Sequence, residues 1–139
     1  YLKKTSRTVC LMGDGECCEG SVWEAAMALS NFKLTSVIPV VDRNRLMIDG
    51  FTEDIMKLEP FADKWRAFGF EVVEIDGHDF DQLAYAFDKA WAADEKPVMI
   101  LANTVKGKGV DFMENNAVYH YASGDSAVCE RAKASIMKG

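Results

Sequence analysis

The stretch LMGDGECCEGSVWEA, residues 11–25, contains the features that decide how this sequence folds. An apolar run at residues 8–12 predicts a buried strand that ends at Gly13. Asp14 then follows the end of that strand, and a helical pattern with a capping box, Ser21 and Glu24, begins a few residues later. The stretch therefore predicts a strand, a tight turn that carries one carboxylate, and a helix over residues 21–34.

The rest of the chain alternates between strand-like and helical patterns. Strands are predicted over residues 36–41, 71–75 and 97–105, and helices over residues 60–70, 80–93 and 126–137. Residues 42–50 are rich in turn formers and are predicted as a loop. Pro39 lacks a backbone donor, which predicts an irregular or peripheral second strand. This alternation predicts an α/β fold, with a mainly parallel sheet flanked by helices, in which residues 1–139 are part of a single domain.

Composition narrows the classes of function. Of the 139 residues, 49% are apolar and 27% are charged, which is ordinary for a globular protein. The net charge of −6 argues against binding to nucleic-acid phosphates, and no apolar run reaches the roughly 18–20 residues of a membrane span. The four cysteines have no zinc-site spacing and do not imply a disulfide framework, so we predict that the protein lies in a reducing cytoplasm. Because the chain starts with Tyr1 and enters a strand almost at once, we expect a piece of a longer protein.

Two polar residues follow the ends of the first two predicted strands. Asp14 follows the first, and Asn44 comes 30 residues later, just after the second. A right-handed crossover would bring both to one edge of the sheet. A carboxylate, an amide oxygen and a nearby main-chain carbonyl suit Mg²⁺, with Ca²⁺ as the alternative. Each of these residues alone is more often part of an ordinary turn. The two together favour a site at which a metal bridges a diphosphate to the protein.

Several motifs together give the sequence a family resemblance: GDGE, EGSVWEA, VDRNRLMIDG, TVKGKGVDFMENN and the histidine of YHY. In this order and spacing they resemble the amino-terminal half of transketolase over nearly the whole chain. Bacterial transketolases split into separate amino- and carboxy-terminal subunits are especially similar. The resemblance implies the thiamine diphosphate-binding fold, here as an incomplete diphosphate-binding module.

The same resemblance implies a role for each residue of the predicted metal–diphosphate site. Asp14 and Asn44 would bind Mg²⁺ through their side chains, and Leu46 would bind it through its main-chain carbonyl. Gly15, with Glu16 beside it, would offer backbone donors to the diphosphate of thiamine diphosphate. The cofactors implied are therefore thiamine diphosphate and Mg²⁺.

Three more residues match positions around the cofactor in transketolases. Ile48 would lie against the thiazolium ring, and Lys106 would lie near the cofactor. His120 would reach the diphosphate and the substrate, which makes it the catalytic candidate. Transketolases commonly have Trp-His-Gly at that point, whereas this chain has Tyr119 and Tyr121 around the histidine. This departure puts the sugar specificity in doubt more than the cofactor.

Two glutamates match acidic residues that lie near the subunit interface of transketolases. Glu19 and Glu24 would join a network of shared protons between the two active sites, because neighbouring buried carboxylates cannot all ionise. Glu24 has a competing assignment, since with Ser21 it could cap its helix. The interface is favoured for Glu19, and the two assignments of Glu24 remain open.

The implied reaction transfers a two-carbon glycolaldehyde unit from a ketose phosphate to an aldose phosphate. The expected partner is a pyrimidine-binding domain or a carboxy-terminal transketolase subunit, in a homodimer or heterotetramer, with no nucleic acid and no membrane. A different thiamine diphosphate enzyme, such as a 2-oxo acid dehydrogenase or deoxyxylulose phosphate synthase, is the first alternative. A non-catalytic interaction subunit is the second, although the presence of both Asp14 and Asn44 argues against it.

Overall fold

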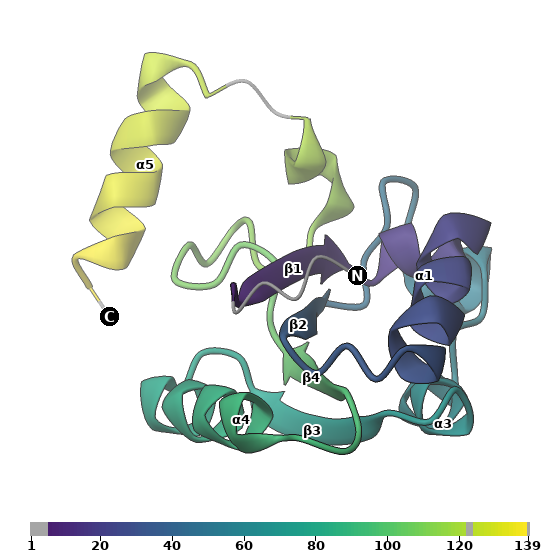
Figure 1. The fold of residues 1–139 in the computed structure, drawn as a ribbon. Coiled ribbons are helices and arrows are strands. Elements are labelled where there is room, and N and C mark those ends of the chain that lie inside the picture. Colours follow the sequence, from purple (N-terminus) through teal and green to yellow (C-terminus); the bar gives the residue numbers. More distant parts are fainter. Residues whose placement is uncertain (1–5, 122–123, 139) are drawn as a thin grey trace.

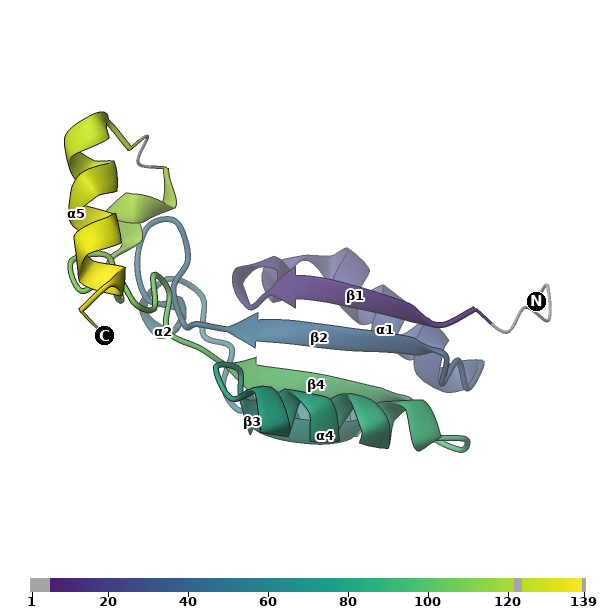
Figure 2. The ribbon, with the colours of Figure 1, turned by 90° about the vertical axis from the view of Figure 1, so that its left-hand side faces the viewer.

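A computed structural model describes residues 6–121 and 124–138 of the chain. Its four strands are β1 (Thr8–Gly13), β2 (Val37–Arg43), β3 (Glu71–Asp76) and β4 (Val98–Asn103). Its helices are α1 (Gly20–Asn31), α2 (Thr52–Ile55), α3 (Phe61–Ala67), α4 (Phe80–Ala92) and α5 (Ser126–Ile136), with short 3-10 turns η1 (Gly15–Cys18) and η2 (Ala117–His120). The strands form one parallel sheet in the order β1-β2-β4-β3 (Figures 1 and 2).

Helices cover the sheet from both sides, as the predicted fold class requires. On one face, Val41 of β2 and Met99 of β4 pack in a cluster with Trp65 of α3. On the other face, Ile38 and Ile100 pack in a cluster that includes two alanines of α4. Side chains alternate between the two faces along a strand, so β2 and β4 are apolar at almost every position. Figure 1 shows α1 and α3 on one side of the sheet and α4 on the other.

The connections between strands explain where the loops gather. The first two crossovers, β1 to β2 and β2 to β3, move in one direction across the sheet, while β3 to β4 moves back. Right-handed crossovers therefore place α4 on the face opposite to α1 and α3. All four strands point the same way, so their following loops lie at one edge of the sheet (Figure 2).

The predicted elements are confirmed with small shifts of their ends. The second strand runs on through Asp42 and Arg43, so the predicted loop begins two residues later than expected. The expectation of a peripheral strand was wrong, because β2 lies between β1 and β4. Pro39 pairs in register with Cys10, and the ladder to β4 begins only at Val40, so the missing donor makes one side of the strand irregular.

The capping-box prediction for α1 was wrong. The helix begins at Gly20, its N-cap residue is Glu19, and no side chain caps it. Glu19 is at the same time the C-cap residue of η1, so the two helical segments follow each other without the extra turn that a Ser21 cap would need. Ser21 therefore lies inside the first turn, and Glu24 has no capping role. By contrast, Asp79 caps α4, because its side chain accepts from two backbone amides of the first turn.

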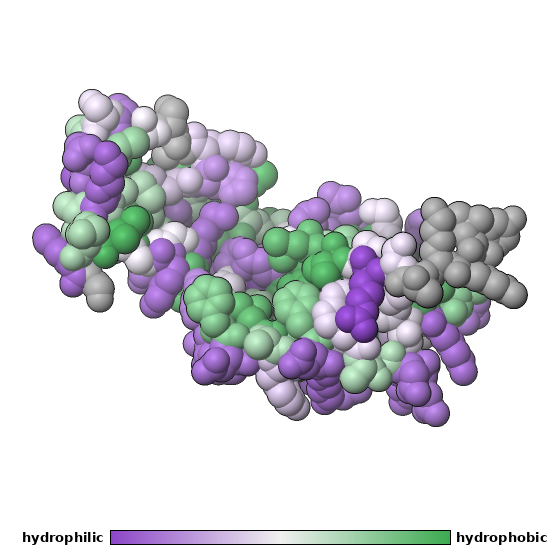
Figure 3. Space-filling view, turned by 60° about the vertical axis from the view of Figure 1, so that its left-hand side comes forward, coloured by the Kyte–Doolittle hydropathy of each residue, from purple (hydrophilic) through white to green (hydrophobic). Residues whose placement is uncertain are grey.

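β1 is much more exposed than the other strands. Val9 and Leu11 pair in register with Ile38 and Val40, so they point to the α4 side of the sheet, yet their side chains are 46% and 70% exposed. Apolar side chains gather on that side of the molecule (Figure 3). Among the strands described, β1 pairs only with β2. Within the part of the chain that the structure describes, β1 therefore has a free edge and an uncovered apolar face.

α5 stands apart from the sheet (Figures 1 and 2). Its residue Ser135 accepts a hydrogen bond from the Asp111 amide at 2.9 Å, and the Arg131 guanidinium lies 4.2 Å from the ring centre of Phe112. These contacts attach α5 to the loop after β4. None of the helices within residues 6–121 and 124–138 is long and apolar enough to cross a membrane.

Candidate active site at the carboxyl ends of the strands

A cavity of about 420 Å³ lies where the loops after β1, β2 and β4 meet. It gathers all the candidate residues of the sequence analysis except Glu24, namely Asp14, Gly15, Glu16, Glu19, Asn44, Leu46, Ile48, Lys106 and His120. Glu24 is exposed on α1, away from this cavity. The structure therefore brings together residues that lie up to 106 positions apart in the sequence.

Asp14 is the most constrained of these residues. Its side chain is only 1% exposed, and its Oδ2 accepts hydrogen bonds from the guanidinium of Arg43 at 2.9 Å and from the Arg45 amide at 2.6 Å. Arg45 takes a left-handed backbone conformation, with φ of 64°, which directs its amide at the carboxylate. Oδ1 accepts no hydrogen bond from the described residues. One carboxylate oxygen is thus held by the protein, and the other is free to bind a ligand.

Arg43 is a residue of this site that the sequence analysis missed. It is 2% exposed, and besides Asp14 it donates to Thr52 Oγ1 at 2.9 Å, Glu59 Oε1 at 2.8 Å and Glu53 Oε1 at 3.4 Å. Burial alone would lower the pKa of the guanidinium, but the hydrogen bonds with Glu59 and Asp14 outweigh burial and raise it. Arg43 therefore stays charged and joins the end of β1 to the segment around α2.

Glu59 and Glu53 complete this network from the segment between β2 and α3. The hydrogen bond from Arg43, followed by one from the Phe61 amide, lowers the pKa of Glu59. The pKa of Glu53 is also lowered, chiefly by the hydrogen bond that its carboxylate accepts from the Leu58 amide. No signal in the sequence marked this network, because the predicted strand ended at residue 41 and left Arg43 in a loop, whereas β2 runs on through Arg43.

The turn after β1 offers backbone donors to the cavity. The Glu16 side chain turns back to accept from the Gly13 amide at 2.7 Å, and the Cys17 amide donates to the Asp14 carbonyl at 3.1 Å. The amides of Gly15 and Glu16 donate to no residue that the structure describes. Two N–H groups at the cavity are therefore open to an anionic ligand.

The loop after β2 is a tight turn that places Asn44, Leu46 and Ile48 together. Asn44 Oδ1 accepts from the Leu46 amide at 3.0 Å, and the Met47 amide donates to the Gly50 carbonyl at 2.8 Å. Leu46 is buried, whereas Ile48 is 48% exposed and lines the cavity. The turn thus places Asn44 beside apolar residues at the cavity wall.

The loop after β4 carries Lys106 to the same cavity. Thr104 Oγ1 donates to the Asp42 side chain, and the Thr104 amide donates to the Arg43 carbonyl at 3.2 Å. The Asn115 amide donates to the Lys106 carbonyl at 2.9 Å, which closes the loop on itself. Further along, η2 brings His120 to the cavity. The backbone on both sides of Lys106 is therefore anchored.

Gly107 is required by the shape of this loop. Its φ is 78°, and a Cβ there would lie 2.6 Å from the Met113 carbonyl oxygen. We expect Gly107→Ala to lower the free energy of unfolding by about 3 kcal/mol, because left-handed strain and a backbone clash add together. Gly109→Ala is the matched control, since φ is 89° but no atom lies within 4 Å of its Cβ, and it should cost about 1 kcal/mol. Equal losses of the two variants in urea unfolding would contradict this interpretation.

Cys17 and Cys18 occupy different environments, although they are neighbours in the sequence. Cys17 is 1% exposed, whereas Cys18 is exposed, and both are free thiols, as are Cys10 and Cys129. Burial, followed by the charges of Asp14 and Glu16, raises the pKa of Cys17 to about 12. The prediction of a reducing cytoplasm stays a prediction.

This difference predicts selective alkylation. At about pH 8, the Cys17 thiolate should be about a thousandfold scarcer than for a cysteine at the ordinary pKa of 9.0. We expect iodoacetamide to modify the exposed Cys18 in the folded protein and to modify Cys17 only after unfolding. Mass spectrometry of the peptides measures both rates in one sample. Similar rates for the two neighbours in the folded state would show that Cys17 is not buried as described.

The oxygen atoms at the cavity fit a hard divalent cation. Asp14 has a free carboxylate oxygen and Asn44 an amide oxygen, and the third candidate ligand is the main-chain carbonyl of Leu46, a residue that lines the same cavity. Within the described ranges, no cluster of three or more His, Cys, Asp or Glu side chains could hold a metal. A metal here would thus have few protein ligands, and Mg²⁺ characteristically completes such a set with water and phosphate oxygens. The open amides of Gly15 and Glu16 suit the phosphate part.

Comparison with known proteins identifies the family. The family model described as "Transketolase, thiamine diphosphate binding domain" matches residues 3–136. The chain belongs to the transketolase family. The predicted family and the thiamine diphosphate-binding fold are therefore confirmed.

The transketolase relatives include split enzymes. The chain is 47% identical over 120 residues to the 6-deoxy-6-sulfo-D-fructose transketolase subunit of Clostridium sp. (strain MSTE9), a match that covers 86% of the chain and 43% of that protein. It is 43% identical over 119 residues to one subunit of the apulose-4-phosphate transketolase of Phocaeicola vulgatus, covering 86% and 42%. The transketolase structure from Campylobacter jejuni superposes with a TM-score of 0.87 at 31% identity, covering 95% of the chain and 21% of that protein. The chain thus spans less than half the length of these curated transketolase relatives.

Proposed function

We propose that this chain supplies the Mg²⁺–thiamine diphosphate site of a transketolase that moves a two-carbon glycolaldehyde unit from a ketose phosphate to an aldose phosphate. One observation carries the proposal: the candidate residues from three strand ends line one cavity. Within it, Asp14 keeps one carboxylate oxygen free beside the open amides of Gly15 and Glu16. The family supports the choice of thiamine diphosphate among diphosphates.

Each residue has a defined task in this proposal. Asp14 and Asn44 hold the metal with their side-chain oxygens, and Leu46 holds it with its carbonyl. The backbone amides of Gly15 and Glu16 would donate hydrogen bonds to the diphosphate, and a bound metal would supply positive charge beside it. These tasks need oxygen ligands at fixed positions. The hydrogen bonds from Arg43 and from the Arg45 amide fix the position of the Asp14 carboxylate.

The remaining cavity residues act nearer the reacting part. Ile48 excludes water beside the thiazolium ring, and Lys106 contributes positive charge near the cofactor. His120 donates a hydrogen bond to the diphosphate or the substrate, and so is the catalytic candidate of this chain. Thiamine diphosphate, when bound, supplies the nucleophilic carbon and electron sink for breaking and making carbon–carbon bonds. The chain's own share of catalysis is thus to bind, orient and shield.

The substrate class follows from the relatives. One is named for 6-deoxy-6-sulfo-D-fructose and another for apulose 4-phosphate, so both sugars carry an anionic group. We propose sugar phosphates as substrates and include a sulfonated ketose in the screen. A screen that also offers pyruvate and other 2-oxo acids separates transketolase from the alternative thiamine diphosphate enzymes.

The partner is proposed to be a pyrimidine-binding domain, on the same polypeptide or on a carboxy-terminal subunit, in a homodimer or heterotetramer. Two relatives are named as subunits, which supports a separate partner chain. Glu19 is exposed at the cavity rim and is the residue proposed to meet the partner, and Glu24 is exposed on α1 nearby in sequence. Both are therefore available to an interface.

Glu19→Gln tests the interface assignment. Because a shared proton between neighbouring carboxylates stabilises their approach, we expect the variant to weaken the association of the subunits and lower turnover together, each by about tenfold. Sedimentation velocity over a concentration series measures the association, and steady-state kinetics measure turnover. Glu24→Gln in parallel shows whether the second glutamate belongs to the same network. Unchanged association and turnover in Glu19→Gln would contradict the assignment.

Calorimetry tests the proposed function itself. The full-length protein, mixed with its pyrimidine-domain partner, is titrated with thiamine diphosphate in the presence of Mg²⁺ and again in the presence of EDTA. We expect binding heat only with the metal, and no turnover from residues 1–139 alone. Absence of heat in both conditions would overturn the proposal. Sugar transfer by the isolated chain would contradict only the expected need for a partner.

A further inference from the structure

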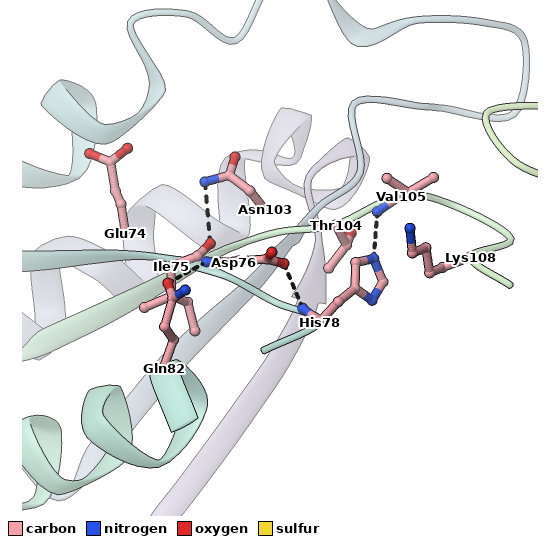
Figure 4. Close-up of a pocket in the computed structure, with 9 residues that line it drawn as sticks. All are labelled: Glu74, Ile75, Asp76, His78, Gln82, Asn103, Thr104, Val105 and Lys108. Carbon is pink, nitrogen blue, oxygen red and sulfur yellow. Dashed lines mark hydrogen bonds between the residues drawn. The ribbon is translucent and has the colours of Figure 1, made fainter. Parts of the chain in front are cut away.

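A second cavity, of about 530 Å³, lies at the carboxyl ends of β3 and β4, where the chain carries several polar side chains outside the site already described (Figure 4). Asp76 and His78 line it from β3 and the following turn, and Val105 and Lys108 line it from the loop after β4. Lys106, between them in sequence, lines the first cavity. The loop after β4 therefore forms part of the wall of both cavities.

His78 makes a specific bond to this loop. Its Nε2 accepts a hydrogen bond from the Val105 amide at 2.8 Å, and its own amide donates to Asp76 Oδ1 at 2.9 Å (Figure 4). A neutral imidazole that accepts at Nε2 must carry its proton on Nδ1. A protonated imidazole has no acceptor and cannot make this bond. The bond to Val105 therefore exists only in one tautomer of neutral His78.

The position of Val105 gives this bond its importance. Val105 immediately precedes Lys106, and on its other side Thr104 is held by Asp42 and by the Arg43 carbonyl. The Asn115 amide holds the Lys106 carbonyl from the far side. The Val105 amide is thus the last backbone anchor before Lys106, and it is held from the turn after β3 rather than from the cofactor cavity. His78 lies at the exposed edge of the protein, where its ring can exchange protons with water.

We propose that His78 is a positioning residue that holds Lys106 in the cofactor cavity while its imidazole is neutral. The inference rests on the proposed function, because it gives the Lys106 position a role in cofactor binding. Protonation of His78 breaks the bond to Val105, the loop loosens, and thiamine diphosphate binds more weakly. His78 touches neither cofactor nor substrate in this scheme and acts only through the backbone.

The second cavity and the turn beside it also carry charged groups. Glu74 and Asp76 come from β3, Asp79 lies at the start of α4, and Lys108 comes from the loop after β4. Among the described residues, the hydrogen bond to the His78 ring comes from the Val105 amide, so the proposal depends on that one contact.

The first test compares variants of the full-length protein with its pyrimidine-domain partner. Thiamine diphosphate affinity is measured with saturating Mg²⁺ at about pH 8 and about pH 5.5. His78→Gln keeps an acceptor near the Nε2 position but does not titrate, and His78→Ala removes the acceptor. Lys108→Met is the matched control from the same cavity, because its side chain bonds to no described residue. Any pH dependence that does not involve His78 is common to all variants, so the ratio of each affinity to that of wild type is the readout.

Between about pH 8 and about pH 5.5, we expect the thiamine diphosphate affinity of wild type to fall about fivefold more than that of His78→Gln. A factor of about five corresponds to the net free energy of one hydrogen bond. His78→Ala should bind about fivefold more weakly than wild type already at pH 8, with the same weak dependence on pH as His78→Gln. Lys108→Met should follow wild type. If the affinities of wild type and His78→Gln fell by the same factor between the two pH values, that result would overturn the inference.

A second measurement does not depend on cofactor binding. Nitrogen NMR of the protein without cofactor at about pH 8 should show His78 protonated on Nδ1, whereas free histidine prefers the other tautomer. Protonation on Nε2 would overturn the inference alone. If instead wild type binds no thiamine diphosphate at pH 8, the proposed function fails and the inference fails with it, so the two failures are distinguishable.

Discussion

Arg43→Met should lower the free energy of unfolding by about 3 kcal/mol, because it leaves the buried Asp14 carboxylate without its charged partner. Asp14 and Arg43 are 1% and 2% exposed, so water cannot replace the lost contact. Methionine keeps most of the volume beside the Phe61 ring, which the Arg43 guanidinium approaches to 5.4 Å. The loss therefore reports the charge network rather than a cavity. Urea unfolding of both proteins measures it.

Arg66→Met is the matched control for Arg43→Met. Arg66 also pairs with two carboxylates, Asp63 and Glu74, each at 2.8 Å, but its side chain is 47% exposed. Solvent screens such surface pairs, so this variant should lose far less stability than Arg43→Met. Equal losses would show that burial of the Arg43 network does not matter.

The pH dependence of stability gives an independent reading of the same network. The pKa of Glu59 in the folded protein is depressed below its usual value of 4.5 by the Arg43 hydrogen bond. A depressed pKa means that the stabilisation is present above pH 4.5 and is lost as the pH falls through the folded pKa. Wild type should therefore lose stability on acidification below that value more steeply than Arg43→Met.

Asp14→Ala should weaken Mg²⁺-dependent binding of thiamine diphosphate by more than about 100-fold, because it removes the only carboxylate of the proposed metal ligands. Asp14→Asn is the companion variant that keeps the fold. Its amide oxygen can accept the bonds from Arg43 and the Arg45 amide, yet it carries no charge for the metal. Calorimetry with saturating Mg²⁺, on the full-length protein and its partner, measures both.

Asp54→Ala controls for the loss of one negative charge near the site. Asp54 is exposed on α2, outside the cavity, and should leave the affinity within about twofold of wild type, since exposed charges interact weakly. Retained tight binding in both Asp14 variants, with a fold confirmed by circular dichroism, would contradict the metal assignment. Weakened binding in all three variants would point to a general charge effect instead.

The strands, and the gathering of the candidate residues at one edge of the sheet, could be predicted because both follow from local patterns. The apolar runs of β2 and β4 are nearly continuous, which is what a strand covered on both faces requires. Asp14 and Asn44 follow strand ends, and parallel strands bring their ends to one edge. The position of Asp14 and Asn44 at the same edge of the sheet could thus be inferred from the sequence alone.

The Arg43 network could not be predicted in this way, because its members are joined only through the fold. Glu59 lies 16 residues after Arg43, and nothing in the intervening sequence marks the pair. The sequence also placed Arg43 in a loop, since the turn formers after it hid the last two residues of β2. The bond from Val105 to His78 spans 27 residues and likewise depends on β3 and β4 being neighbours. The capping box failed for a similar reason, because η1 fixes the start of α1.

The uncovered β1 strand has a practical consequence for anyone who purifies these 139 residues. An open strand edge can pair with the same edge of another molecule, and burial of the adjacent apolar face stabilises that pairing. Val9 and Leu11 provide that face, and no proline or lysine interrupts residues 8–13. Concentrated samples of the isolated chain should therefore form soluble aggregates that begin at β1, and Leu11→Lys should keep the chain monomeric.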